Sequence, residues 1–107
     1  MKLILAIVSN DDSSTVMKEL VKHKFFVTKL SSSGGLLRKG NTTLMIGAKD
    51  DDVDEIIDLI TKFSKTRTEL VPNSIISDMG IIPSTPLEVT VGGATIFVLD
   101  VEKFKKI

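Results

Sequence analysis

A glycine-rich segment with basic and amide side chains carries the most suggestive chemistry in this sequence. The pair Gly34 and Gly35 is followed by Arg38, Lys39 and Asn41. Glycines let backbone N–H groups turn toward a ligand without a Cβ in the way, and the other three add a guanidinium fork, a point charge and an amide. This combination is typical of phosphate or nucleotide binding. A solvated glycine turn at a hairpin tip explains the same composition and stays open as an alternative.

The segment is not a P-loop, although part of its spacing matches one. Gly35 and Gly40 stand at the glycine positions of that motif, and Thr42 stands at its Ser/Thr position. Asn41, however, occupies the place of the phosphate-binding lysine. The β-branched residues that follow indicate a strand where a P-loop needs the start of a helix. The sequence therefore excludes nucleotide hydrolysis by a P-loop mechanism.

Length and charge restrict the classes of partner. The 107 residues predict a single domain, 1–107, and fourteen basic residues balance fourteen acidic ones. Because the chain has no net charge to attract nucleic acid, and no Trp or Tyr to stack on its bases, nucleic acid is not an expected partner. The apolar run Leu3 to Val8 is too short for a signal peptide or a membrane span. Together with the lack of cysteine, this predicts a cytoplasmic protein without membrane insertion.

Apolar periodicity gives two copies of a strand-helix-strand pattern, with the helices opening after Asp11-Asp12 and after Asp50-Asp51-Asp52 as N-caps. The pattern predicts an α+β, ferredoxin-like fold with the order βαββαβ. The expected elements in order are strand Leu3–Val8, a helix, strands Phe25–Leu30 and Thr42–Ala48, a second helix, and strand Glu69–Val71.

Beyond this repeat the sequence predicts a surface loop and an additional C-terminal strand. Prolines and serines break any period from Pro72 to Pro86. The runs Leu87 to Val91 and Ala94 to Val101, separated by Gly92-Gly93, then indicate a hairpin. If the helices lie on one face of the sheet, the apolar strands leave the other face uncovered. Self-association is expected to cover that face.

The sequence does not predict an enzyme. His23 lies in a basic helix end where it complements the helix dipole. The acidic run at Asp50 to Asp52 lacks the spacing of a calcium loop, and the serines at Ser31 to Ser33 have no paired base. We therefore expect no catalytic residue, no metal and no cofactor.

A set of short motifs is spread over nearly the whole chain. The motifs are Thr28-Lys29-Leu30, Gly34-Gly35, Leu37-Arg38, Gly40-Asn41-Thr42-Thr43, Glu88-Val89, Val91-Gly92-Gly93-Ala94-Thr95 and Phe97-Val98. Together they resemble one protein family, the PII-like cyclic di-AMP receptors of bacteria. The resemblance implies a homotrimer with nucleotide sites in the clefts between subunits. It also implies signal transduction without catalysis, in which loops reorganise on binding and regulate a downstream protein that the sequence does not identify.

The resemblance also implies a set of ligand-binding residues. Thr28 and Asn41 would hydrogen-bond cyclic di-AMP through their side chains, and Asn41, just before the third strand, is expected to face Thr28. One wall of the cleft would be the backbone near Gly34, Gly35, Leu36, Leu37 and Gly47, with Arg38 beside it. The adjoining wall would contain Gly92, Gly93, Ala94 and Phe97.

Two positions differ from the family pattern. Phe26 and Leu36 stand where similar proteins carry a basic and an aromatic residue. An alternative therefore remains, in which the chain is a trimeric PII-like scaffold that works through its loops without a nucleotide.

Overall fold

The computed structural model describes residues 1–30, 40–71 and 87–107. The predicted loop from Pro72 to Pro86 and the site residues Gly34 to Arg38 lie outside these ranges. The elements in chain order are β1 (Lys2–Ser9), α1 (Asn10–Lys22), β2 (Val27–Leu30), β3 (Asn41–Ala48), the 3-10 turn η1 (Asp50–Asp52), α2 (Val53–Phe63), β4 (Arg67–Val71), β5 (Leu87–Val91) and β6 (Ala94–Asp100).

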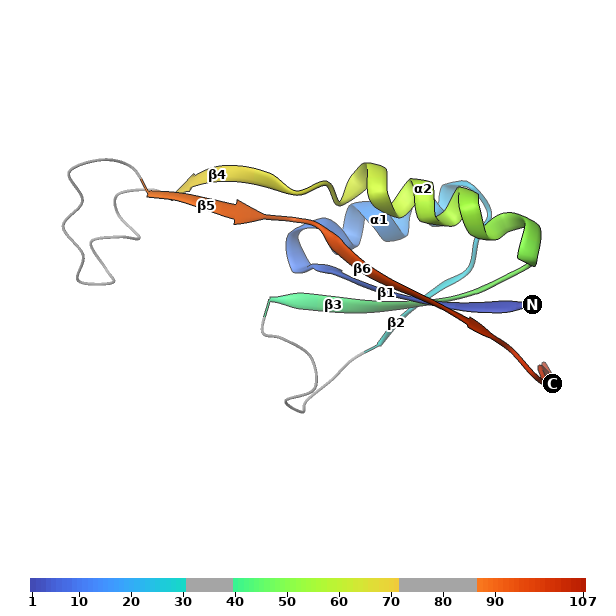
Figure 1. The fold of residues 1–107 in the computed structure, drawn as a ribbon. Helices are drawn as coiled ribbons and strands as arrows, with labels where there is room; N and C mark the ends of the chain where they lie inside the picture. Colours follow the sequence, from blue (N-terminus) through green and yellow to red (C-terminus); the bar gives the residue numbers. More distant parts are fainter. Residues whose placement is uncertain (31–39, 72–86) are drawn as a thin grey trace.

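Four strands form an antiparallel sheet in the order β2-β3-β1-β6, and α1 and α2 cover one of its faces (Figure 1). On the central strand, Ile4 lies opposite Ile46 of β3 and Val98 of β6. This α+β arrangement is compatible with the predicted ferredoxin-like fold. Neither α1 nor α2, the helices of the described ranges, is long and apolar enough to span a membrane.

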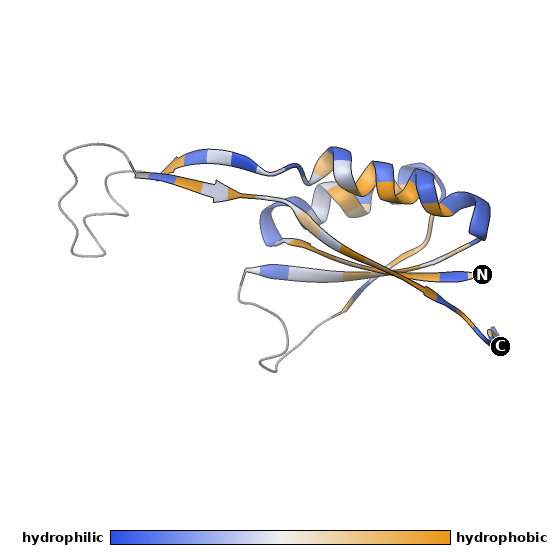
Figure 2. Ribbon diagram, in the orientation of Figure 1, coloured by the Kyte–Doolittle hydropathy of each residue, from blue (hydrophilic) through white to orange (hydrophobic). Residues whose placement is uncertain are grey.

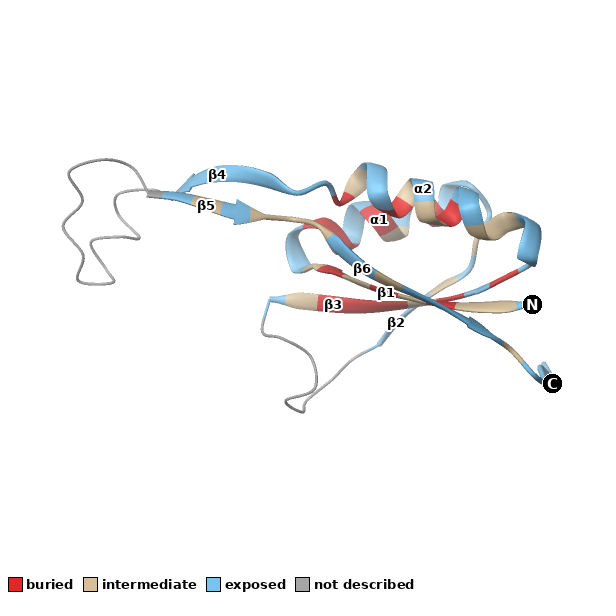
Figure 3. Cartoon of the chain, viewed as in Figure 1, coloured by how far each residue is buried: buried red, intermediate tan, exposed pale blue. Residues whose placement is uncertain are grey.

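The core lies between the sheet and the two helices (Figure 3). Alternate residues of β1 point into it, and Figure 2 shows the apolar stripe along α2 that meets them. The opposite residues of β1, Leu3, Leu5 and Ile7, are only partly buried. The single chain thus covers one face of the sheet. The fully buried core residues are Ile4, Ala6, Val8, Val16, Leu20, Leu44, Ile46, Ile56 and Ile60.

The starts of the helices differ slightly from those predicted. The N-cap of α1 is Ser9, and Asp11 and Asp12 lie inside the first turn. The acidic run Asp50 to Asp52 forms η1, directly before α2. Carboxylates are favourable near helix N-termini through the helix dipole as well as through capping, so the composition alone does not fix their position within the first turn.

The predicted C-terminal hairpin is wrong. β5 pairs with β4, from Arg67 opposite Val91 onward, whereas β6 pairs with β1. Gly92 and Gly93, both at positive φ, connect β5 to β6 and do not reverse the chain. β6 therefore takes the sheet position expected for the fourth strand. β4 and β5 form a separate two-stranded ribbon, the arm, which projects from the body (Figure 1).

An ion pair fastens the base of the arm to the first turn of α1. The Arg67 guanidinium donates to both carboxylate oxygens of Asp12, with Nη2 to Oδ1 at 2.9 Å and Nη1 to Oδ2 at 3.1 Å. Ser9 Oγ donates to the same carboxylate at 3.0 Å. Asp12 is only 7% exposed. The hydrogen bond from Arg67 lowers the pKa of Asp12 despite this burial, so the pair stays charged.

Gly92→Ala should destabilise the protein. Gly92 has φ of 84°, and an added Cβ would overlap the Lys65 carbonyl oxygen and lie 2.7 Å from Arg67 Nη1. We expect a loss of about 1 to 3 kcal/mol in the free energy of unfolding, measured by urea denaturation. Gly47→Ala is the matched control, because a Cβ added at Gly47 would meet nothing within 4 Å. Equal stability of the two variants would contradict the crowding at Gly92.

Asp12→Asn should destabilise the protein at neutral pH but much less in acid. Because the folded-state pKa of Asp12 is lowered, the unfolded chain binds the proton first as the pH falls below about 3.9. The stability contributed by the charged pair is therefore complete above that pH and is lost as the pH drops through the folded-state pKa. Urea unfolding of both proteins at pH 7 and pH 3 measures this difference. An equal difference in the free energy of unfolding at both pH values would refute the stabilising role of the charged pair. Asp11→Asn, in the same turn, is the control.

Candidate functional site

A pocket of about 480 Å³ opens where the ends of β1 and β3 meet β2 and the C-terminal tail. Thr28 lies opposite Met45 in the β2–β3 pairing, and Gly47 lies opposite Leu3 in the β1–β3 pairing. These residues belong to the face of the sheet that no described helix covers. The lining residues are Met1, Lys2, Leu3, Phe26, Thr28, Met45, Gly47, Val101, Phe104 and Lys106.

The pocket combines ammonium groups with aromatic rings. Lys2 and Lys106 bring positive charge, and Phe26 and Phe104 bring rings. Lys2 forms an ion pair with Asp100. The hydrogen bond between the two raises the pKa of Lys2 and lowers that of Asp100, so both groups remain charged at neutral pH. Such a pocket suits a ligand that has both anionic and flat apolar parts.

Two of the predicted binding residues meet in this pocket, and a third lies apart from them. Thr28 and Gly47 both line it. Asn41 is on the same face of the sheet but pairs with Ser9, four positions along β3 from the Met45 that faces Thr28. That separation is about 13 Å along the strand. The expectation that Asn41 directly faces Thr28 is therefore wrong within one chain.

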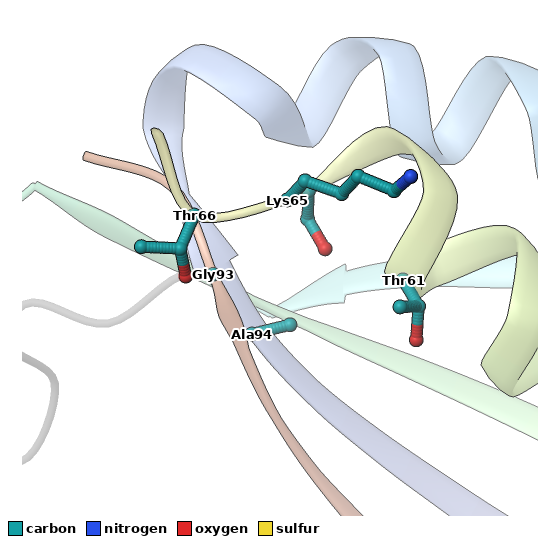
Figure 4. Close-up of a pocket in the computed structure, with 6 residues that line it drawn as sticks. Thr61, Lys65, Thr66, Gly93 and Ala94 are labelled. Carbon is teal, nitrogen blue, oxygen red and sulfur yellow. The ribbon is translucent and has the colours of Figure 1, made fainter. Parts of the chain in front are cut away.

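The predicted second wall lies elsewhere in the chain. Gly93 and Ala94 line a separate pocket of about 380 Å³ at the end of α2, together with Thr61, Ser64, Lys65 and Thr66 (Figure 4). The Gly93 N–H donates to the Ser64 carbonyl oxygen at 2.5 Å. This amide already has a partner within the chain, so it is not a free donor for a phosphate.

The remaining two residues of that wall also lie outside the first pocket. Gly92 packs against the base of the arm, where a Cβ added to it would crowd Lys65 and Arg67. Phe97 lies opposite Leu5 on the helix-free face and is 53% exposed. One chain thus presents the two predicted walls at different places. Of the first wall, only Gly47 lies within the described ranges, because its other residues, Gly34 to Leu37, lie outside them.

Sequence reasoning missed the contribution of the C-terminal tail and of Lys2. Charged and apolar residues alternate in the tail, which by itself indicates only a segment lying along a surface. Its position follows from the pairing of β6 with β1, which brings the end of β6 next to the start of the chain. The Val101 N–H donates to the Met1 carbonyl oxygen at 3.2 Å, and Phe104 and Lys106 then reach the pocket.

Comparison with known proteins assigns the chain to a family. A family model described as cyclic-di-AMP receptor matches residues 1–107. A crystal structure of a functionally unknown protein from Pediococcus pentosaceus ATCC 25745 is similar, with 37% sequence identity and a TM-score of 0.77, over 99% of this chain and 96% of that one. The family match confirms the resemblance found in the sequence. The chain belongs to the cyclic-di-AMP receptor family.

Proposed function

We propose that the protein is a cytosolic receptor that binds cyclic di-AMP in clefts between the subunits of a homotrimer. Binding reorganises its loops, and the altered surface regulates a partner protein without turnover of the nucleotide. The observation that carries this proposal is the pocket at Thr28 and Gly47, which combines two ammonium groups with two aromatic rings in a chain of the cyclic-di-AMP receptor family.

The chemistry of the pocket matches the two kinds of group in a cyclic dinucleotide. The Lys106 ammonium suits phosphate oxygens, and the Lys2 ammonium, one of whose three N–H donors is used by Asp100, has two more to offer. The rings of Phe26 and Phe104 offer flat apolar surfaces for an adenine base. The Thr28 hydroxyl both donates and accepts a hydrogen bond, so it fits the polar edge of a base. Binding needs only these contacts, and no acid-base pair is required.

The helix-free face supports assembly of several copies. Phe97 is 53% exposed and Leu99 is 45% exposed, and both point away from the helices because they lie opposite Leu5 and Leu3 of β1. An exposed apolar patch of this kind is typical of an interface. In a trimer, the wall containing Gly92 and Phe97 of one subunit would complete the cleft at Thr28 of its neighbour. This brings together the two walls that are separate in one chain.

The arm is the proposed element that carries the signal to the partner. It is a two-stranded ribbon, and its side chains at Thr68, Glu69, Leu70 and Glu88 are exposed. The radius of gyration is 17.0 Å, against about 13 Å for a compact domain of this length. Beyond its base, where Asp12 holds Arg67, a projecting ribbon with few core contacts can bend at little cost in stability.

Thr28→Val should weaken the binding of cyclic di-AMP. The change keeps the shape of the side chain but removes a hydroxyl that lines the pocket. We expect a roughly two- to tenfold loss of affinity in isothermal titration calorimetry. Thr15→Val, on the exposed side of α1, is the control and should bind like the wild type.

Parallel titrations with cyclic di-GMP and ATP test the choice of nucleotide. The wild type should bind cyclic di-AMP more tightly than either. No heat with any of the three nucleotides would refute the receptor proposal and favour the nucleotide-independent scaffold.

Leu99→Lys should break the trimer. Leu99 lies on the helix-free face, and a lysine there would place charge in the proposed interface. Light scattering of the wild type should give three times the 11.7 kDa chain mass, and the variant should give a single chain. Val21→Lys is the control, because Val21 is also exposed but lies on α1. A monomeric wild type at micromolar concentration would overturn the trimer.

A further inference from the structure

The first turn of α1 contacts two segments that are far apart in the sequence. On one side it holds the start of β3, where the glycine-rich segment ends. The Asn10 N–H donates to the Gly40 carbonyl oxygen at 2.8 Å, and the Thr42 hydroxyl donates to Asn10 Oδ1 at 2.5 Å. On the other side, two residues further along the helix, Asp12 holds Arg67 at the base of the arm.

The contacts within this turn make it act as one unit. The Ser13 hydroxyl donates to the Asn10 carbonyl oxygen at 2.9 Å, and Ser9 donates to the Asp12 carboxylate. Asp12, Ser13 and Thr42 are all less than one-tenth exposed. Because these three side chains are buried, a shift of the turn would leave a polar group of at least one of them without its partner.

The buried carboxylate makes the arm sensitive to the position of the turn. The Asp12–Arg67 contact uses two parallel N–H···O bonds, which depend strongly on geometry. If the turn moves, the two bonds cannot both be kept, and a carboxylate that is 7% exposed loses its charged partner. Arg67 also lies close to Gly92, which leads into β6, since a Cβ on Gly92 would lie 2.7 Å from Arg67 Nη1.

We propose that the first turn of α1 couples the start of β3 to the base of the β4–β5 arm, with Asn10–Thr42 and Asp12–Arg67 as its two contacts. A change at Gly40 or Thr42 thereby alters how firmly the arm is held. This coupling is a property of the protein without any ligand.

The test uses two neighbouring threonines that differ in one respect. Thr42 and Thr43 are each 6% exposed, but only Thr42 bonds to the turn, and Thr43 Oγ1 has no hydrogen-bond partner among the residues that the structure describes. Thr42→Val removes the hydrogen bond to Asn10, whereas Thr43→Val removes a hydroxyl that makes no such bond. Both replacements keep the size of the side chain and favour a strand.

Amide hydrogen exchange of the ligand-free variants measures the coupling. In Thr42→Val the amides of β4 and β5 should exchange roughly two- to tenfold faster than in the wild type, relative to the amides of α2. In Thr43→Val they should exchange as in the wild type. The inference is overturned if arm exchange in Thr42→Val matches that in Thr43→Val.

The reciprocal variant gives an independent reading should Thr42→Val fold poorly. Arg67→Gln removes the charge from the arm side of the turn and does not touch β3. Exchange of the Asn10 amide, which is bonded to Gly40, should become faster. Unchanged exchange at Asn10, with faster exchange confined to the arm, would show that the two contacts are independent and would refute the coupling.

A nucleotide titration extends the test to signalling, and this extension rests on the proposed function. Saturating cyclic di-AMP should shift the amide resonances of β4 and β5 in the wild type, and the shifts should be smaller in Thr42→Val at equal occupancy. Equal shifts would overturn a route through the turn. Absence of binding, detected by calorimetry, would refute the receptor proposal but leave the ligand-free result decisive for the coupling.

Discussion

Two helices can cover only one face of a four-stranded sheet, and this constraint governs most of what the protein can do. α1 and α2 bury Ile4, Ala6 and Val8 of the central strand completely. The other side chains of β1, together with Phe97 and Leu99 of β6, are left facing outward. The pocket at Thr28 forms on this same face. Burial on one side therefore gives the chain its stability, while the uncovered side carries the pocket and the exposed apolar surface on which the proposed ligand binding and assembly rest.

The glycine pair between β5 and β6 connects the arm to the edge of the sheet. Both glycines have positive φ, and the chain continues through them from the arm into the edge of the sheet. Because the arm contributes little to the core, its position depends on polar contacts at its base, chiefly the pair of Asp12 and Arg67. Moving the arm away would leave the buried Asp12 carboxylate without its charged partner, which is costly, so the pair restricts the position of the arm. The arm is thus positioned by specific bonds at its base, and none of its described residues belongs to the hydrophobic core.

The sequence predicted the repeated strand-helix-strand pattern well, because local periodicity alone determines which residues of Leu3 to Val8 and of α2 share a face. The partners of the strands were harder to predict. The Gly92-Gly93 signal is the same for a hairpin and for a bend between two strands, and only the long-range pairing of β6 with β1 distinguishes them. Thr28 and Gly47, both expected at the binding site, line one pocket, whereas Phe104 and Lys106 reach that pocket only through the pairing of β6 with β1.

The contribution of the tail to the pocket has a consequence for how this protein family can diverge. The pocket is lined by three residues that follow β6, namely Val101, Phe104 and Lys106. Phe104 and Lys106 are exposed and do not belong to the hydrophobic core. Substitutions there change the charge and shape of the pocket without disturbing the packing between sheet and helices. Segments outside regular structure tolerate substitution far better than core strands do. The lining of the pocket can therefore evolve at these positions while the scaffold is preserved.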